Sequence, residues 1–146
     1  MGKTILYVED EESDVYLLNH AFEQLGLKQT FTLVTDGEQA IRYLSGQEPY
    51  VDRDRYPMPC LVMLDLNVPR INGFEFLQWR RQHPLARKIP VVVFTSSSSQ
   101  QDIERAYDLG AAAYLIKQPN PEDWSRCVGA IRDFWLEQNI SPNSKS

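Results

Sequence analysis

Short runs of apolar residues alternate along this chain with longer segments in which apolar positions recur every third or fourth residue. The short runs are typical of strands buried on both faces, and the longer period is typical of amphipathic helices. The pattern predicts five strands, at Thr4–Val8, Phe31–Val34, Cys60–Leu66, Ile89–Thr95 and Ala112–Ile116. Strands and helices in strict alternation indicate an α/β protein, with a parallel sheet covered on both faces.

The intervening segments predict five helices, and several of their ends are marked. They are Ser13–Leu25, Asp36–Leu44, Ile71–His83, Gln100–Leu109 and Pro121–Gln138. Gly26 follows the first helix as a stop signal, and Asp36 can cap the second. In the last helix, apolar side chains continue at helical spacing as far as Phe134 and Trp135, which indicates contact with the core.

The length and composition predict one domain, over residues 1–139. With 146 residues, of which 42% are hydrophobic, the chain can fill one core but not two ordinary domains. The segment Gln47–Pro59 is rich in proline and tyrosine and is predicted to form an ordered surface loop. Residues 140–146 are small and polar, so we predict a flexible C-terminal tail.

The charge narrows the range of partners. A net charge of -5 and a pI near 5.0 disfavour nucleic acid and anionic membrane surfaces as partners. The sequence also contains no long apolar segment that would serve as a signal or a membrane span. We therefore expect a cytoplasmic protein with specific protein partners.

Three carboxylates are predicted at one edge of the sheet. Glu9 and Asp10 end the first strand, and Asp65 lies near the end of the third. Ligands of open α/β sheets bind outside the carboxyl ends of the strands. Carboxylates brought that close repel each other unless a cation joins them, and Mg²⁺ prefers such oxygen ligands. Asp65 can then act as a nucleophile that takes up a phosphoryl group as an acyl phosphate.

Two further polar residues end the neighbouring strands. The hydroxyl of Thr95 can donate to a phosphate oxygen, and the ammonium of Lys117 can pair with the phosphate or with Asp65. Each residue alone is an ordinary feature of a strand end. Their joint placement with the carboxylates, in one strand and helix repeat, is a much less probable accident and predicts a site.

These residues lie in segments that together resemble the receiver domains of two-component response regulators, over nearly the whole chain. The matching segments are Leu6-Tyr7-Val8-Glu9-Asp10-Glu11, Leu64-Asp65-Leu66-Asn67-Val68-Pro69, Asn72-Gly73, Val93-Phe94-Thr95-Ser96, Gly110-Ala111 and Tyr114-Leu115-Ile116-Lys117. The resemblance implies a flavodoxin-like, doubly wound (βα)5 fold with strand order 2-1-3-4-5.

The resemblance also implies roles for the site residues. Asp65 would accept a phosphoryl group from a sensor histidine kinase, with Lys117 contacting the phosphate. Mg²⁺ would be bound directly by Asp10, through water by Glu9, and by Asp65 and the backbone carbonyl of Asn67. The chain would then be a phosphoacceptor with self-catalysed transfer and autodephosphorylation only, and not an enzyme.

Output is expected to leave through a changed surface. By resemblance, Thr95 and Tyr114 are the switch pair that alters the fourth helix, the fifth strand and the fifth helix. We expect a homodimer through that surface, because it would carry more apolar area than a monomer needs. Its candidate interface residues are Ile103, Tyr107, Phe134 and Trp135.

Finer features resemble the response regulators that are paired with bacterial phytochromes. These features are the Asp-Leu-Asn-Val-Pro run from Asp65, the long loop before the third strand and the Phe-Trp pair near the C-terminus.

One departure from the family is Gln118, which separates Lys117 from Pro119. A cis bond before Gln118 would cost about 2.5–4 kcal/mol, because the proline that favours it is displaced.

Three other functions compete with this interpretation. A degenerate receiver could act as a phosphorylation-independent docking protein, although the acidic cluster is intact. An aspartyl-phosphate phosphohydrolase needs a second carboxylate as acid and base, where this chain has Asn67. A flavin-binding module needs a phosphate loop after the first strand, where this chain has four consecutive acidic residues.

Overall fold

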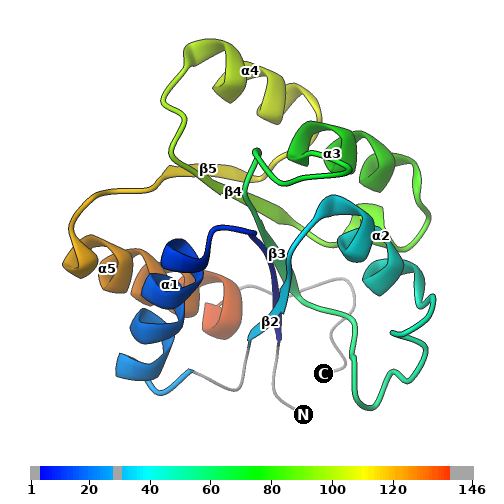
Figure 1. The fold of residues 1–146 in the computed structure, drawn as a ribbon, viewed down its shortest axis with the longest axis horizontal. Helices are drawn as coiled ribbons and strands as arrows, with labels where there is room; N and C mark the ends of the chain where they lie inside the picture. Colours follow the sequence, from blue (N-terminus) through cyan, green and yellow to red (C-terminus); the bar gives the residue numbers. More distant parts are fainter. Residues whose placement is uncertain (1–3, 28–30, 139–146) are drawn as a thin grey trace.

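The computed structural model describes residues 4–27 and 31–138 and contains one parallel sheet (Figure 1). Its strands are β1 (Ile5–Val8), β2 (Phe31–Val34), β3 (Leu61–Leu64), β4 (Val91–Thr95) and β5 (Ala113–Ile116). The order across the sheet is β2-β1-β3-β4-β5, and every neighbouring pair is parallel. The predicted flavodoxin-like topology is confirmed. The order brings β1 and β3 together, so the residues that follow these two strands meet at one edge.

Helices cover both faces of the sheet (Figure 1). They are α1 (Glu12–Gln24), α2 (Gly37–Ser45), α3 (Gly73–Gln82), α4 (Gln100–Asp108) and α5 (Pro121–Ile131), with a short 3₁₀ turn η2 (Ala86–Lys88). The sequence pattern predicts that the fifth helix is one α-helix to Gln138. Instead, α5 ends at Ile131 and continues as a π-helix, η3 (Arg132–Gln138). The wider π turn leaves Phe134 exposed, while Trp135 packs against the core.

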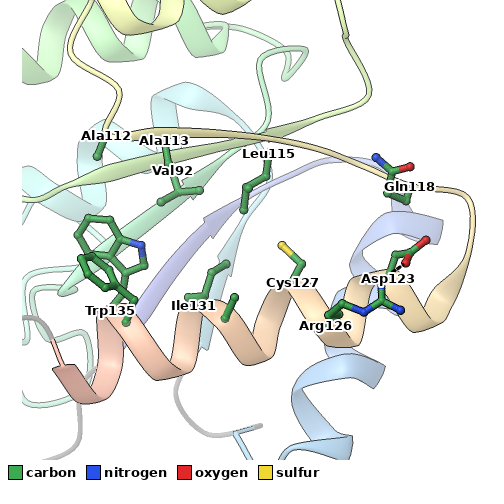
Figure 2. A pocket seen from close by; sticks show the side chains of 12 residues that line it. Val92, Ala112, Ala113, Leu115, Gln118, Asp123, Arg126, Cys127, Ile131 and Trp135 are labelled. Carbon is green, nitrogen blue, oxygen red and sulfur yellow. Dashed lines mark hydrogen bonds and ion pairs between the residues drawn. The ribbon is translucent and has the colours of Figure 1, made fainter.

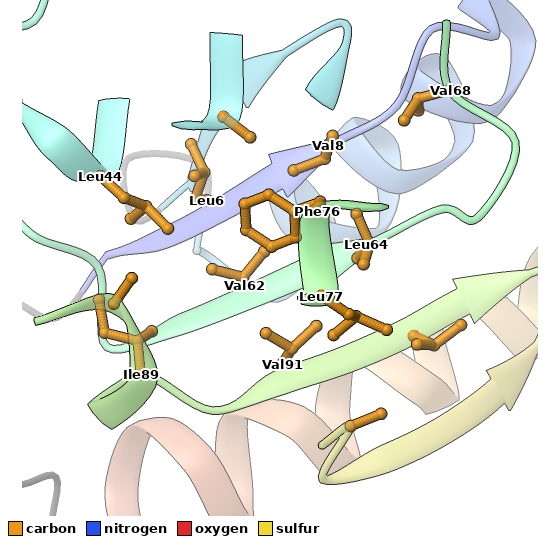
Figure 3. Packing of buried hydrophobic residues seen from close by; sticks show 14 of the residues in the cluster. Leu6, Val8, Leu44, Val62, Leu64, Val68, Phe76, Leu77, Ile89 and Val91 are labelled. Carbon is orange, nitrogen blue, oxygen red and sulfur yellow. The ribbon is translucent and has the colours of Figure 1, made fainter. Parts of the chain in front are cut away.

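Two apolar clusters lie on opposite faces of the sheet, because successive strand residues point to opposite sides. On one face, Leu6 and Val8 of β1 pack with α2 and α3, around Phe76 and Leu77 (Figure 3). On the other face, the alternate residues of β1 pack with α1 and α5. All residues of β1, β3 and β4 are buried, which explains why their sequences read as unbroken apolar runs.

Side-chain caps fix the helices next to the sheet edge. The Asp36 carboxylate accepts a hydrogen bond of 2.7 Å from the Gln39 backbone N–H, which confirms the predicted cap of α2. At the start of α3, Asn72 and Glu75 each accept from the other's backbone N–H in a capping box. The capping box marks the end of the loop between β3 and α3, which begins at Asp65.

The loop between α2 and β3 is held by aromatic and cationic contacts. Tyr43, Tyr50 and Tyr56 pack against one another, with ring centroids 5.0 to 6.0 Å apart. Arg53 donates to the backbone carbonyls of Leu44 and Tyr56, at 3.1 Å each. These contacts agree with the predicted ordered loop. The predicted tail, residues 140–146, lies outside the described residues, so its flexibility and the domain boundary at 139 stay predictions.

Candidate functional site

Two carboxylates meet at the edge of the sheet where the strands end. Glu9 directly follows β1 and is fully buried, and Asp65 directly follows β3 and is 5% exposed. The backbone N–H of Asp65 donates to the Val8 carbonyl at 3.1 Å, which keeps the two strand ends in register. The structure therefore brings these two predicted residues together.

Lys117 lies between three carboxylates. It follows β5, and its ammonium Nζ is 2.5 Å from Glu9 Oε1, 2.7 Å from Asp14 Oδ2 and 3.2 Å from Asp65 Oδ2. Its Nζ also lies 5.9 Å from the centre of the ring of Phe94, a residue of β4. Only 7% of it is exposed, so the ion pairs form in a largely desolvated environment. The Lys117–Gln118 peptide bond is trans.

Burial and hydrogen bonding shift the pKa values of Glu9 and Lys117. Burial raises the pKa of the Glu9 carboxyl, although the hydrogen bond from Lys117 opposes this. For Lys117, burial alone would lower the pKa, but the hydrogen bonds to Asp14 and Glu9 outweigh it and the pKa is raised. Tyr7 also donates to Glu9 Oε1, at 3.1 Å. The lysine is therefore a firmly held cation, which offsets the charge of the carboxylates around it.

Asp10 and Asn67 lie at the mouth of the site. Asp10 is exposed, and with Asn67 it lines a hollow of about 520 Å³ between the β3–α3 loop and α4. Phe74 and Arg105 also line this hollow, and the Arg105 guanidinium lies 4.2 Å from the centre of the Phe74 ring. The backbone N–H of Asn67 donates to Asp65 Oδ1 at 3.4 Å. Asp10 therefore faces solvent beside the loop that follows Asp65.

The donor atoms at this edge suit a hard divalent cation. Carboxylate oxygens from β1 and β3 and carbonyl oxygens of the adjoining loop are the ligands that Mg²⁺ prefers. Within residues 4–27 and 31–138, no three His, Cys, Asp or Glu side chains are arranged to hold a metal by themselves. The Lys117 ammonium instead occupies the space among Glu9, Asp14 and Asp65. The metal ligands proposed from the sequence thus fit in chemistry, and their coordination stays a prediction.

The predicted switch pair meets at Ser97, in the loop between β4 and α4. Thr95 is fully buried, and its hydroxyl accepts from the Ser97 backbone N–H at 3.5 Å. The Tyr114 hydroxyl donates to the Ser97 carbonyl at 2.9 Å. The Ser97 hydroxyl donates in turn to Asp102 Oδ2 of α4 at 2.7 Å. Ser97 therefore connects Thr95, Tyr114 and α4.

Sequence reasoning missed Asp14 and Ser97. Asp14 lies in the first turn of α1, where acidic residues commonly complement the helix dipole, so its type and position gave no signal. Ser97 lies in a run of four serines, Ser96–Ser99, which reads as a simple loop. Neither residue is at a strand end, and both become visible only through side-chain contacts.

The candidate interface residues flank the edge strand β5 on two helices. On α4, Tyr107 is 47% exposed and Ile103 is half-buried. In η3, Phe134 is 54% exposed, and it lines with Trp135 an apolar hollow of about 770 Å³. Figure 2 shows that β5 residues such as Leu115 face α5 and η3 across this hollow.

None of the helices in the described ranges is both long enough and apolar enough to cross a bilayer.

Comparison with known proteins gives one consistent family. The model of the response regulator receiver domain matches residues 5–128. Over 138 residues, the chain is 38% identical to the probable methanogenesis regulatory protein FilR2 of Methanothrix harundinacea, covering 94% of this chain and 86% of FilR2. Over 140 residues, it is 36% identical to the response regulator Rcp1 of Synechocystis sp., covering 96% of this chain and 93% of Rcp1.

Solved structures agree with the sequence comparisons. The phosphorylated cyanobacterial phytochrome response regulator RcpA superposes with a TM-score of 0.89 at 32% identity, covering 98% of this chain and all of that one. The Mn²⁺-bound form of Rcp1 superposes with a TM-score of 0.82 at 35% identity, covering 96% and 99%. With its sheet order, its strand-end acidic site and these likenesses, the chain belongs to the response regulator receiver domain family.

Proposed function

We propose that this receiver domain accepts a phosphoryl group on Asp65 from a sensor histidine kinase. The observation that carries the proposal is the Lys117 ammonium, held 3.2 Å from Asp65 Oδ2 in a desolvated pocket at the strand ends. Asp65 is nearly buried, but its pairing with a fixed cation means that its carboxylate is not an isolated buried charge. The same cation offsets the negative charge of an incoming phosphoryl group.

The transfer is a displacement at phosphorus. An Asp65 carboxylate oxygen forms the new P–O bond, and the P–N bond to the kinase histidine breaks, leaving its electron pair on the imidazole nitrogen. Lys117 stays protonated and neutralises part of the charge on the phosphoryl oxygens. The residues proposed to hold Mg²⁺ are Asp10, Asp65, the Asn67 carbonyl and, through water, Glu9. When bound, Mg²⁺ supplies positive charge that offsets repulsion between the phosphoryl group and the carboxylates.

The signal is proposed to pass through Ser97. The Thr95 hydroxyl can donate to a phosphoryl oxygen only after the phosphoryl group arrives. Drawing Thr95 inward loosens its long contact with the Ser97 N–H, while Tyr114 holds the carbonyl of the same residue. Because Ser97 is also bonded to Asp102 of α4, a movement there changes the surface formed by α4, β5 and α5.

The partners are proposed from likeness and exposure. RcpA is a phytochrome response regulator, so a phytochrome histidine kinase is the proposed phosphodonor. The proposed compartment is the cytoplasm, because ATP supplies such kinases there. A homodimer is proposed through Tyr107 and Ile103 of α4 with Phe134 and Trp135 of η3. This interface is supported by the exposed aromatic surface on both sides of β5.

The phosphoacceptor is tested with a small phosphodonor. Incubation with acetyl phosphate and Mg²⁺ should add one phosphoryl mass to the wild-type chain, and Asp65→Asn should abolish the addition. A chelator should block labelling. Phosphorylation that persists in Asp65→Asn would place the acceptor elsewhere, and an unlabelled wild type would favour a degenerate receiver that acts as a docking protein.

The output surface is tested by light scattering with and without phosphodonor. We expect a wild-type dimer whose stability changes on phosphorylation, and a monomer in the double variant Tyr107→Glu with Trp135→Glu. A wild type that is monomeric in both states would refute output through a dimer. A dimer that survives the double substitution would place the interface elsewhere.

A further inference from the structure

The three N–H bonds of the Lys117 ammonium have three carboxylate partners, and only two of these have a role in the proposed transfer. Asp65 is the acceptor and Glu9 a proposed metal residue, whereas Asp14 has none. A lysine ammonium has three donors and no acceptor, so Glu9, Asp14 and Asp65 together use its whole hydrogen-bonding capacity.

Asp14 is one of the two nearer partners of this ammonium. Its Oδ2 lies 2.7 Å from Nζ, compared with 3.2 Å for the Asp65 oxygen. Asp14 is itself 23% exposed, on α1, so it approaches Lys117 from the side that faces solvent. Glu9 approaches from the buried side. The ammonium is thus fixed at two points before it contacts Asp65.

We infer that Asp14 is a positioning residue that acts through Lys117, and this inference rests on the proposed phosphorylation of Asp65. With Glu9, Asp14 holds the ammonium so that the third N–H points to the Asp65 oxygen. Lysine carries its charge on a flexible stem, and the contacts with Glu9 and Asp14 restrict where that charge lies. The phosphoryl group then meets a cation that is already in place, without the cost of reordering it.

An alternative role for Asp14 is the general one of an acidic residue near a helix N-terminus. Glu12 provides the matched control, because it is exposed, lies in the same first turn of α1 and carries the same charge. Glu12→Gln therefore removes one unit of negative charge from the same turn, as Asp14→Asn does. Asp14→Asn keeps an acceptor oxygen near Lys117, whereas Asp14→Ala removes it.

The first experiment measures amine acylation of metal-free protein, followed by peptide mapping of Lys117. In the wild type, Lys117 should react much more slowly than the exposed Lys88, which serves as an internal reference. Asp14→Ala should speed acylation of Lys117 by about tenfold, the effect of losing one hydrogen bond to a charged group. Glu12→Gln should leave it unchanged. Wild-type protection of Lys117 in Asp14→Ala would overturn the inference.

The second experiment measures the rate of phosphorylation by acetyl phosphate at saturating Mg²⁺. Asp14→Ala should lower the rate by about tenfold, while Asp14→Asn stays within about threefold and Glu12→Gln matches the wild type. Urea midpoints establish that each variant is folded. A wild-type rate in Asp14→Ala would overturn the positioning role. If the wild type takes up no phosphoryl group, the proposed function fails, and acylation still shows whether Asp14 holds Lys117.

Discussion

Replacing Gly73 with alanine should push the end of strand β3, which carries the proposed phosphoacceptor Asp65, away from helix α3. Gly73 is the first residue of α3, and its backbone N–H donates to the Leu66 carbonyl at 3.0 Å. A Cβ at this position would lie 2.6 Å from Leu66 Cα and 2.9 Å from the Asp65 carbonyl oxygen. Ordinary contacts begin near 3.4 Å, so the shortfall at Leu66 is about 0.8 Å, and both neighbours are backbone atoms.

The expected magnitude follows from this overlap. Forcing a methyl group into a closely packed position costs about 1–3 kcal/mol. Alanine recovers at most about 1 kcal/mol of helix propensity, so Gly73→Ala should lower the free energy of unfolding by about 1–2 kcal/mol. For a chain of this length, that lowers Tm by roughly 2–8 °C. A displacement of this size at Asp65 should also slow its phosphorylation by about 10- to 100-fold.

The control is the same substitution in α5. A Cβ at Gly129 would meet only Leu25 Cδ1, at 3.8 Å, which is an ordinary contact. Gly129→Ala should therefore raise Tm by roughly 2–4 °C, because alanine is the better helix former. Thermal unfolding followed by circular dichroism measures both variants. Equal Tm values for the two variants, or an unchanged phosphorylation rate in Gly73→Ala, would refute the reasoning from backbone contact.

Three further predictions concern other parts of the molecule. Gly37→Ala should destabilise more than Gly73→Ala, because its Cβ would overlap the Ile71 carbonyl oxygen more severely than the Gly73 Cβ overlaps its neighbours. A urea midpoint equal to that of the wild type would contradict this. Mg²⁺ should raise the stability of the wild type by about 2.7 kcal/mol at roughly a hundred times Kd, and Asp10→Asn should lose most of this gain. A wild-type Tm that ignores Mg²⁺ would argue against the metal site. Burial raises the pKa of Cys127 to about 11, so its alkylation by iodoacetamide should be slow at pH 8 and still accelerate above pH 9. A rate that levels off below pH 9 would show that the thiol is not buried in this way.

Much of the fold could be predicted because its signals are local. Each strand is a short apolar run, and a parallel sheet places every strand end at one edge. The ends of the runs were therefore enough to predict that Asp65, Thr95 and Lys117 lie at the same edge of the sheet. The change from α5 to the π-helix η3 could not be predicted, because Phe134 and Trp135 continue the spacing of an α-helix.

The parts of the site that were missed depend on the reach of side chains. Asp14 and Lys117 meet because the long lysine side chain reaches from the end of β5 to the first turn of α1, and the hydrophobic periodicity of the sequence does not indicate such a contact. Ser97 acquires its proposed role because four hydrogen bonds join it to Thr95, Ser99, Asp102 and Tyr114. A serine in a polar loop carries no sign of such convergence.

The Lys117 contacts also make the acidic site depend on the completion of the fold. Its partners Glu9 and Asp14 lie 108 and 103 residues earlier, and Asp65 lies 52 residues earlier. A nascent or truncated chain that stops before β5 holds these carboxylates without the cation that joins them, and their mutual repulsion opposes docking of α1 beside β1 and β3. The cation that offsets these carboxylates is therefore in place only after the last strand, β5, has been made.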